Sequence, residues 1–418
     1  MTPAHLAIWG ISGLATAGMI LRPMQVPEAV WALAGAMALV GLGLLPLSDA
    51  LAGVSKGADV YFFLTGMMLL AELARQEGLF DWLAARAASL ARGSAARLFG
   101  LVYIVGIGVT VFLSNDATAV VLTPAVAAVA RAAKIARPLP YVFSCAFVAN
   151  AASFVLPISN PANFVIYAGR MPPLLEWVPR YALPSLLSVG VAYVLLRFTQ
   201  REALKDSVAR DTTVPVLSRA GKLTGIGIAA AAVVLMLASA CSLKLGVPTL
   251  MAGLVTLGAV TGAARSSPWR VLRGVSWGVV PLVAGLFVMV EGLDRSGVMR
   301  VASDLLHRQV SRSGGLAAAG AGVLAGLASN LINNLPAGLI AGTAAQNAGV
   351  APDVTAAILI GIDLGPNLSV TGSLATILWL AALRRDGIEV SAWDFMKLGL
   401  LIMPPTLLLS LAAVLRVH

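Results

Sequence analysis

Two aspartates within apolar sequence are the residues of this chain most able to carry chemistry. Asp116 lies in the polar run 114–118 (Ser-Asn-Asp-Ala-Thr), and Asp363 precedes a run rich in glycine, proline and small polar residues. A charge at membrane depth costs roughly 2.5–3.5 kcal/mol on insertion scales, so such residues usually face a polar cavity and serve transport. We predict that Asp116 and Asp363 carry exchanged protons. The alternatives are a hydrated Asp116 in a surface loop and an Asp363 that only caps a broken helix.

The polar run around Asp116 has the pattern of a hairpin tip. Each flanking apolar arm has about fifteen residues, too short to cross roughly 30 Å of hydrocarbon but long enough to enter it and return. A second polar run, Asn333 and Asn334 followed by Leu-Pro, occupies the corresponding place in the second half. We therefore predict two re-entrant helical hairpins, at about 97–131 and 315–347.

Each predicted hairpin is followed by an apolar segment that helix-breaking residues interrupt, at about 157–163 and 363–373. Proline removes a helical hydrogen bond, and glycine tolerates unwinding. Unpaired backbone groups are not tolerated against lipid, so an unwound segment lines a cavity or packs within protein. The alternative is a structural kink. We expect the amides and hydroxyls of the tips and breaks to bind substrate: Ser114, Asn115, Asn160, Asn163, Asn333, Asn334, Asn367, Ser369, Thr371 and Ser373.

The composition is that of a polytopic membrane protein. The chain is 59% hydrophobic and 11% charged, and its mean hydropathy is +0.89. The net charge of +10 comes from Lys and Arg in short loops, as the positive-inside rule expects, so we infer no nucleic-acid partner. The 3 histidines lie at ends or in loops, and no metalloprotease or hydrolase motif is present, which argues against an enzyme. The 2 cysteines are too few for a disulfide framework or a thiolate metal cage.

The second half of the sequence repeats the first. Five apolar spans and one hairpin follow in the same order, and Gly66 and Asn115 match Gly285 and Asn334 at one constant offset in the numbering. An odd number of spans inverts the second copy, as in the inverted repeats of secondary transporters. We expect an all-α polytopic membrane protein in three parts: repeat 1 at 1–197, a cytoplasmic linker at 198–221 and repeat 2 at 222–418.

Loop charges indicate an orientation in the membrane. Alternation of the spans places most Lys and Arg residues on one side, which the positive-inside rule makes cytoplasmic. Both termini are then extracytoplasmic, and the expected location is the plasma (bacterial inner) membrane. The amphipathic stretches 79–91 and 298–309 are expected to lie at the membrane interface. Glu72 and Glu291, at matched positions near span ends, are interpreted as structural acids with basic neighbours.

The sequence resembles the arsenical pump membrane protein family, the arsenite efflux permeases of the ion transporter superfamily. The similarity covers nearly the whole chain. It rests on the runs 114–116 (Ser-Asn-Asp), 333–336 (Asn-Asn-Leu-Pro) and, above all, 363–367 (Asp-Leu-Gly-Pro-Asn) with 372–379 (Gly-Ser-Leu-Ala-Thr-Ile-Leu-Trp). The paired Ser-Asn-Thr tips of the related sodium-dicarboxylate carriers are not present at these positions.

This resemblance implies efflux of arsenite and antimonite in exchange for protons, by alternating access around a midplane site and without a cofactor. Some members also pair with a soluble arsenical ATPase. Trivalent arsenic is a small, largely neutral hydroxide that amides and hydroxyls bind reversibly, whereas a three-thiolate cage would suit a sensor. A sodium/proton antiporter, another anion or oxyacid carrier of the superfamily and, less favoured, a channel lined by the hairpins remain as alternatives.

Overall fold

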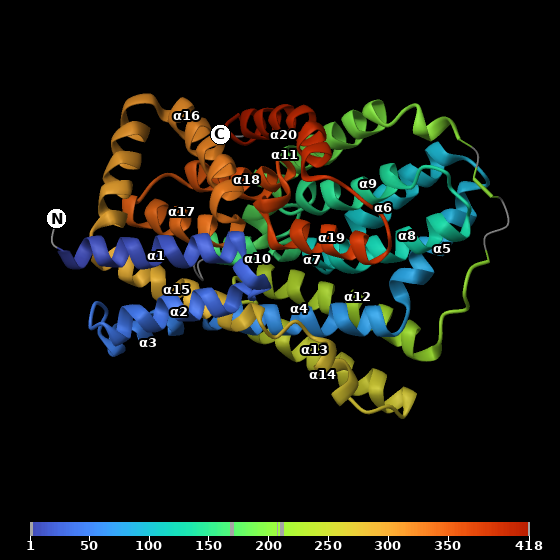
Figure 1. Cartoon of the computed structure of the whole chain (residues 1–418), viewed down its shortest axis with the longest axis horizontal. Coiled ribbons are helices and arrows are strands. Elements are labelled where there is room, and N and C mark those ends of the chain that lie inside the picture. Colours follow the sequence, from blue (N-terminus) through green and yellow to red (C-terminus); the bar gives the residue numbers. More distant parts are fainter. Residues whose placement is uncertain (1–2, 168–170, 207, 210–212, 417–418) are drawn as a thin grey trace.

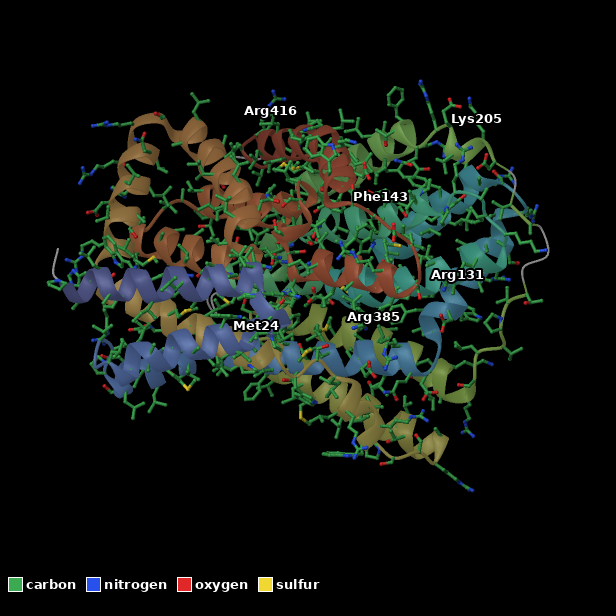
Figure 2. All side chains as sticks on the ribbon, in the orientation of Figure 1. Met24, Arg131, Phe143, Lys205, Arg385 and Arg416 are labelled. Atoms are coloured by element: carbon green, nitrogen blue, oxygen red, sulfur yellow. The ribbon has the colours of Figure 1, made fainter. Side chains whose placement is uncertain are left out.

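The computed structural model describes residues 3–167, 171–206, 208–209 and 213–416, and every secondary-structure element in these residues is helical. Large apolar side chains such as Leu14 and Leu186 are more than two-thirds exposed, as expected where lipid is the solvent. In Figure 2, Lys205 and Arg416 lie at the periphery, whereas Phe143 lies inside the helix bundle. The predicted all-α polytopic membrane fold is confirmed.

The described part of the first half forms ten α-helices before the long helix α11 ends it, and three short helices of other types lie between them. In chain order they are α1 (Pro3–Leu21), η1 (Pro23–Gln25), α2 (Glu28–Gly41), α3 (Leu47–Lys56), α4 (Ala58–Gln76), α5 (Leu79–Ala91), α6 (Ala95–Phe112), α7 (Asn115–Ala117), η2 (Thr118–Leu122), α8 (Thr123–Ala132), α9 (Leu139–Ala151), η3 (Pro157–Ser159), α10 (Pro161–Tyr167) and α11 (Leu174–Thr199).

The second half follows the same order. Helices α16 and α17 begin at one common offset from α5 and α7, and α18 and α19 begin at a second common offset from α9 and α10, which supports two repeats. In chain order the helices are α12 (Arg219–Ala240), α13 (Gly246–Ala264), α14 (Trp269–Gly274), α15 (Val279–Arg295), α16 (Val298–Ile332), α17 (Asn334–Ala348), α18 (Pro352–Leu364), η5 (Gly365–Asn367), η6 (Val370–Gly372), α19 (Leu374–Arg385) and α20 (Ala392–Val414).

Seven described helices are long and apolar enough to cross a membrane alone, namely α1, α6, α11, α12, α13, α16 and α20, and the pair α3 and α4, bent by 49°, makes an eighth. The sequence predicted about ten spans. The two sets of helices differ, because α6 and α16 belong to the predicted re-entrant hairpins although each is long enough to cross. Four predicted spans fall short of the roughly 20 residues that a crossing needs: α2 and α15 are short helices, and α9 with α10 and α18 with α19 are spans broken into pieces. The predicted helix breaks thus account for two of the four.

The first hairpin is formed by α6, α7, η2 and α8. Helix α6 has 18 residues, longer than the arm expected from the sequence, because Ser94 caps it by accepting a hydrogen bond from the Arg97 N–H. The chain turns back after Phe112, and Thr118 in η2 contacts Thr110 in α6 (Oγ1 to Oγ1, 2.8 Å). In the second hairpin, α16 is kinked at Gly314, which separates an amphipathic segment from the arm that packs on α17. Figure 1 shows the two hairpins approaching the centre from opposite ends of the molecule.

The linker between the repeats is attached to the base of the first hairpin. The short helix η4 (Ala203–Lys205) is followed by Asp206, whose carboxylate accepts hydrogen bonds from the Arg137 guanidinium at 2.6 and 2.8 Å. This hydrogen-bonded ion pair lowers the pKa of the Asp206 carboxyl below its usual value. The linker therefore holds the loop between α8 and α9 on the side that the sequence predicts to be cytoplasmic.

The two repeats interlock through matched glycines. Helix α4 crosses α13 of the other repeat where Gly66 meets the backbone of Thr249, and α15 crosses α2 where Gly285 meets the backbone of Ala32. Gly66 and Gly285 occupy matched positions of the two repeats. Each repeat therefore uses the same glycine position to cross a helix of the other repeat. Small residues permit such close backbone approach in membrane helices. These crossings form a rigid frame beside the hairpins.

Replacement of Gly66 by alanine is expected to destabilise this frame. A Cβ atom at this position would collide with backbone atoms of Thr249, and overpacking of this kind costs about 1–3 kcal/mol, more than the roughly 1 kcal/mol that alanine gains in helix propensity. The midpoint of thermal unfolding of purified Gly66→Ala should fall. Gly258→Ala on α13, where the added Cβ meets open space, is the matched control, and an equal midpoint for both variants would contradict the crossing.

Candidate functional site

A cavity of about 190 Å³ leads into the molecule between α4, the first hairpin and the segment before α15. It is lined by Ser114 and Asp116 of the first hairpin tip, by Glu72 and Arg75 near the end of α4, and by apolar side chains. Among the described residues, the Asp116 carboxylate has no hydrogen-bond or ion-pair partner. An unpaired carboxylate in a mostly apolar cavity is a group that can exchange protons or contact a solute.

A smaller space of about 10 Å³ lies where the two hairpin tips meet the first helix break and the start of α19. Asn115 and Asp116 reach it from the first tip, Asn334 from the second, and Asn160 from the first break. It holds no more than about one water. The N-terminal ends of α7, α10, α17 and α19 border it, and the labels of α7, α10 and α19 fall close together at the centre of Figure 1. The structure therefore brings four of the predicted site residues together.

The hairpin tips are held by their own side chains. The Ser114 hydroxyl accepts a hydrogen bond from the Ala117 N–H at 3.1 Å, and the Asn115 Oδ1 accepts one from the Asp116 N–H at 2.9 Å. In the second tip, Asn333 has a φ of 71°, and its Oδ1 accepts from the Leu335 N–H at 3.4 Å. A positive φ is uncommon outside glycine, and asparagine adopts one more often than most residues, so the polar tip residues also shape the turns.

The helix breaks span residues 152–160 and 365–373 rather than the predicted 157–163 and 363–373, and two predicted residues lie within helices. The first break ends at Asn160, because Pro161 starts α10 and proline fits the first helical turn. Asn163 therefore lies in α10, and Asp363 lies in the last turn of α18. The first break meets the end of α18 where the Asn160 Nδ2 donates to the Asp363 Oδ1 at 2.7 Å.

The remaining amides of the breaks are also buried and hydrogen-bonded. The Asn163 Nδ2 donates to the backbone carbonyls of Ser153 and Pro157 at 3.0 and 3.3 Å. The Asn367 Nδ2 donates to the carbonyl of Phe147 at 3.2 Å. Both asparagines have no exposed surface. They bond the backbone around the breaks and do not line the small central space.

Three predicted binding residues lie apart from this centre. The Ser369 hydroxyl donates to Asn330 Oδ1 at 2.7 Å, and Thr371, which is exposed, donates to the Asn330 carbonyl at 3.1 Å. Ser373 caps α19 by accepting from the Thr376 N–H at 3.1 Å. None of the three lines the two cavities described above. Their role in substrate binding remains a prediction.

Sequence reasoning missed two asparagines that organise the site. Asn150, which is buried at the end of α9, donates to Asn367 Oδ1 at 3.0 Å. Asn330 in α16 donates to the carbonyl of Gly365 at 2.9 Å and so holds the second break against the second hairpin. The signal for Asn150 was its place in the repeat, because it precedes Asp363 by the same offset that relates α9 to α18.

The matched glutamates pair with basic groups, as expected. Glu72 accepts hydrogen bonds from the Arg75 guanidinium at 2.5 and 2.7 Å beside the larger cavity. At the matched position, Glu291 pairs with Lys56 at 2.6 Å and with Arg295 at 3.5 Å. Here α3 packs closely on α15, with Gly53 of α3 against Phe287 and Glu291. The molecule is therefore asymmetric, because the cavity on the α4 side measures about 190 Å³ and the equivalent space between α15 and the second hairpin about 20 Å³.

The two cysteines do not form a metalloid site with one another. Cys145 is fully buried in α9, whereas Cys241 is exposed at the end of α12. No group of three or more His, Cys, Asp or Glu side chains in the described part of the chain is arranged to hold a metal ion. Any metalloid in the central region would meet amides, hydroxyls and carboxylates.

Comparisons with known proteins agree with this architecture. Residues 8–361 match the CitMHS family, described as citrate transporter. The arsenical pump membrane proteins of Yersinia enterocolitica and Escherichia coli K12 are 27% and 26% identical to this chain, each with 83% of both chains covered. An uncharacterized transporter of Mycobacterium tuberculosis is 27% identical, with 94% of both chains covered. The resemblance to arsenical pump membrane proteins is thus confirmed.

Among solved structures, the crystal structure of the YdaH transporter of Alcanivorax borkumensis, described as having an unusual topology, superimposes with a TM-score of 0.60. The alignment covers 88% of this chain and 87% of that chain, at 17% sequence identity. At this identity the likeness shows a shared fold. Because 88% of this chain is covered, the shared fold includes parts of both halves.

Proposed function

Because this chain belongs to the CitMHS citrate transporter family, we propose that it is a secondary active carrier that exports arsenite and antimonite in exchange for protons. The observation that carries the proposal is the junction of both hairpin tips with the first helix break, lined by three asparagines and Asp116. Several relatives named arsenical pump membrane protein supply the substrate class.

The chemistry of the junction suits a neutral metalloid hydroxide. Asn115, Asn160 and Asn334 present amides, and the N-terminal ends of half-helices direct partially positive N–H groups toward oxygen atoms of a solute. Hydroxyl groups of trivalent arsenic can donate to amide oxygens and accept from N–H groups. Binding of this kind is reversible, which a carrier needs in order to release its cargo.

Proton coupling is assigned to Asp116 and Asp363. Asp116 lines both the 190 Å³ cavity and the central junction, so the same group is within reach of an entering proton and of the solute. Asp363 accepts a hydrogen bond from Asn160, which lines the junction. A proton that neutralises a carboxylate needed to hold the solute would displace it, and the inward proton gradient would then drive efflux through differential binding in two states.

Alternating access is supported by the asymmetry of the matched cavities. The central junction has room for only about one water, so a solute can occupy it only if the hairpin tips move apart. The cavity beside Glu72 gives access from one side, while the equivalent space beside Leu286 and Asn333 measures only about 20 Å³. We propose that the cavity faces the cytoplasm of a bacterial inner membrane, with extracytoplasmic termini, and that a soluble ATPase is an optional partner.

Citrate is the second candidate substrate, because the family is described as citrate transporter. Helix N-termini favour anions, and four of them meet at the junction. However, the guanidinium of Arg75, the basic side chain lining the 190 Å³ cavity, is already bound by Glu72, and citrate carries about three negative charges at neutral pH that would need cationic partners. The site therefore favours a neutral hydroxide over citrate.

The proposal is tested by transport in everted membrane vesicles that contain the protein. Arsenite, antimonite, citrate and Na⁺ are offered side by side, with and without a proton gradient, against vesicles lacking the protein. We expect uphill accumulation of arsenite and antimonite that an uncoupler abolishes. Accumulation of citrate alone would favour the second candidate, uphill Na⁺ movement alone would favour an antiporter, and flux that never exceeds equilibrium would indicate a channel.

A further inference from the structure

Three oxygen atoms buried at the crossing of the two broken spans have no hydrogen-bond partner among the described residues. They are Asn150 Oδ1, Asn163 Oδ1 and Asp363 Oδ2. Each belongs to a side chain with at most 1% of its surface exposed. Buried polar atoms are nearly always paired, because an unpaired one costs about 1–3 kcal/mol. Three of them on neighbouring side chains call for a common partner.

These side chains belong to one connected group, here called the amide ring: Asn150, Ser153, Asn160, Asn163, Asp363 and Asn367. The Asn163 Nδ2 donates to the backbone carbonyl of Ser153. The backbone N–H of Ser153 in turn donates to the backbone carbonyl of Asn150 at 3.2 Å. Asn150 bonds Asn367, which lies one helical turn after Asp363, and Asp363 bonds Asn160. Asn160 returns to Asn163 through a backbone hydrogen bond of 3.1 Å. The ring is closed and draws on both repeats.

Neighbouring groups fix the orientation of the amides. The Asn163 Nδ2 faces two backbone carbonyls, which only accept hydrogen bonds, so its unpaired atom is an oxygen. The Asn367 Nδ2 faces the Phe147 carbonyl, so its Oδ1 must accept from the Asn150 Nδ2, which leaves the Asn150 Oδ1 unpaired. The missing partner must therefore be electron-poor.

Charge points in the same direction. Asp363 is fully buried, and its hydrogen-bond partner among the described residues is the neutral amide of Asn160. The ion pairs of the described chain do not include Asp363. An ionised carboxylate in such a place is very costly without a compensating positive charge. One positive charge with affinity for oxygen would both neutralise Asp363 and satisfy the amides.

We propose that the amide ring binds one Na⁺ ion through Asp363 Oδ2, Asn150 Oδ1 and Asn163 Oδ1. Carboxylate and amide oxygens are the ligands that hard cations prefer. A single carboxylate matches a single positive charge, whereas divalent ions usually require more acidic ligands. Na⁺ is favoured over the larger K⁺ because hydrogen bonds of 2.7–3.3 Å hold the ring members close together.

This site goes beyond the proposed function. A proton on Asp363 and a Na⁺ ion at the ring exclude one another, so the same carboxylate can respond to either gradient. Na⁺ binding does not depend on which solute is carried. It can therefore be measured on the resting protein, and its failure is distinguishable from a failure of arsenite transport.

The test uses purified full-length protein in detergent. Its thermal unfolding midpoint is measured in NaCl, KCl and choline chloride at equal ionic strength, and bound ²²Na⁺ is measured by equilibrium dialysis. We expect about one bound Na⁺ per chain and a midpoint that rises with NaCl alone, because a ligand that binds only the folded state stabilises it. The apparent dissociation constant should rise by up to about tenfold for each unit of acidification as protons compete.

Two variants locate the ion. Asp363→Asn keeps the shape of the side chain and should abolish both the ²²Na⁺ binding and the midpoint shift. Asp116→Asn removes the unpaired acid of the 190 Å³ cavity, which lies outside the ring, and should keep both. If Asp363→Asn cannot be purified, Asn163→Ala, which loses one neutral ligand, should weaken Na⁺ binding by about tenfold or more. Equal shifts in NaCl and KCl for the unmodified protein, or undiminished ²²Na⁺ binding in the tested ring variant, would overturn the proposal.

Discussion

Asp116→Asn is expected to abolish proton-driven efflux while leaving downhill exchange of arsenite. The replacement keeps the size of the side chain and its ability to form hydrogen bonds, but it removes the group that titrates. Asp116 lines both the 190 Å³ cavity and the junction of the hairpin tips, whereas Glu72, the other acid that lines the cavity, is paired with Arg75. In everted vesicles, uphill arsenite accumulation should fall to the level of vesicles without the protein, and arsenite-for-arsenite exchange should persist.

The control for this experiment is Asp81→Asn, which removes an exposed acid on α5 and should transport as the unmodified protein does. Loss of exchange as well as of accumulation in Asp116→Asn would place the residue in substrate binding rather than coupling. Full proton-driven accumulation by the double variant Asp116→Asn with Asp363→Asn would rule out carboxylate coupling by these two residues and direct attention to Glu72 and Glu291.

Alanine at Asn115 or Asn334 is expected to weaken the apparent affinity for arsenite. The two asparagines face the same small space from opposite hairpin tips. Loss of one hydrogen-bond partner in a buried site costs about 1–3 kcal/mol, which corresponds to roughly a 5- to 150-fold rise in KM. The maximal rate should fall less than the affinity. Initial rates of arsenite uptake into everted vesicles, measured over a range of concentrations, give both quantities.

Asn347→Ala is the matched control, because Asn347 is an asparagine in the same helix as Asn334 but lies at its far end, where it bonds Asp294 near the protein surface. Its KM should be unchanged. If both tip variants also keep the KM of the unmodified protein, the hairpin tips are not part of the binding site. If antimonite and arsenite affinities fall by different factors, the tips take part in discriminating between the two metalloids.

The sequence alone determined the membrane class, the repeat and the approximate positions of hairpins and breaks. These features are local, because they depend on the length of apolar runs and on where proline, glycine and small polar residues interrupt them. The starts of α7 and α17 at Asn115 and Asn334 agree with the constant offset read from single amino-acid matches. The exact extents of the breaks were less well predicted, because Pro161 begins a helix rather than extending the unwound segment.

Only the tertiary structure decided which polar residues meet. Asn160 bonds Asp363 and Asn150 bonds Asn367, and in each pair the two partners come from different repeats. Hydropathy and spacing carry no information about such contacts, because they depend on how the two repeats pack against one another. For the same reason, the sequence grouped Ser369 and Thr371 with the central amides, whereas the fold places them on Asn330. The similar patterns of the two repeats also could not show that the cavity lies beside α4 and not beside α15. That difference arises from tertiary packing, of α3 on α15 and of α14 on α4.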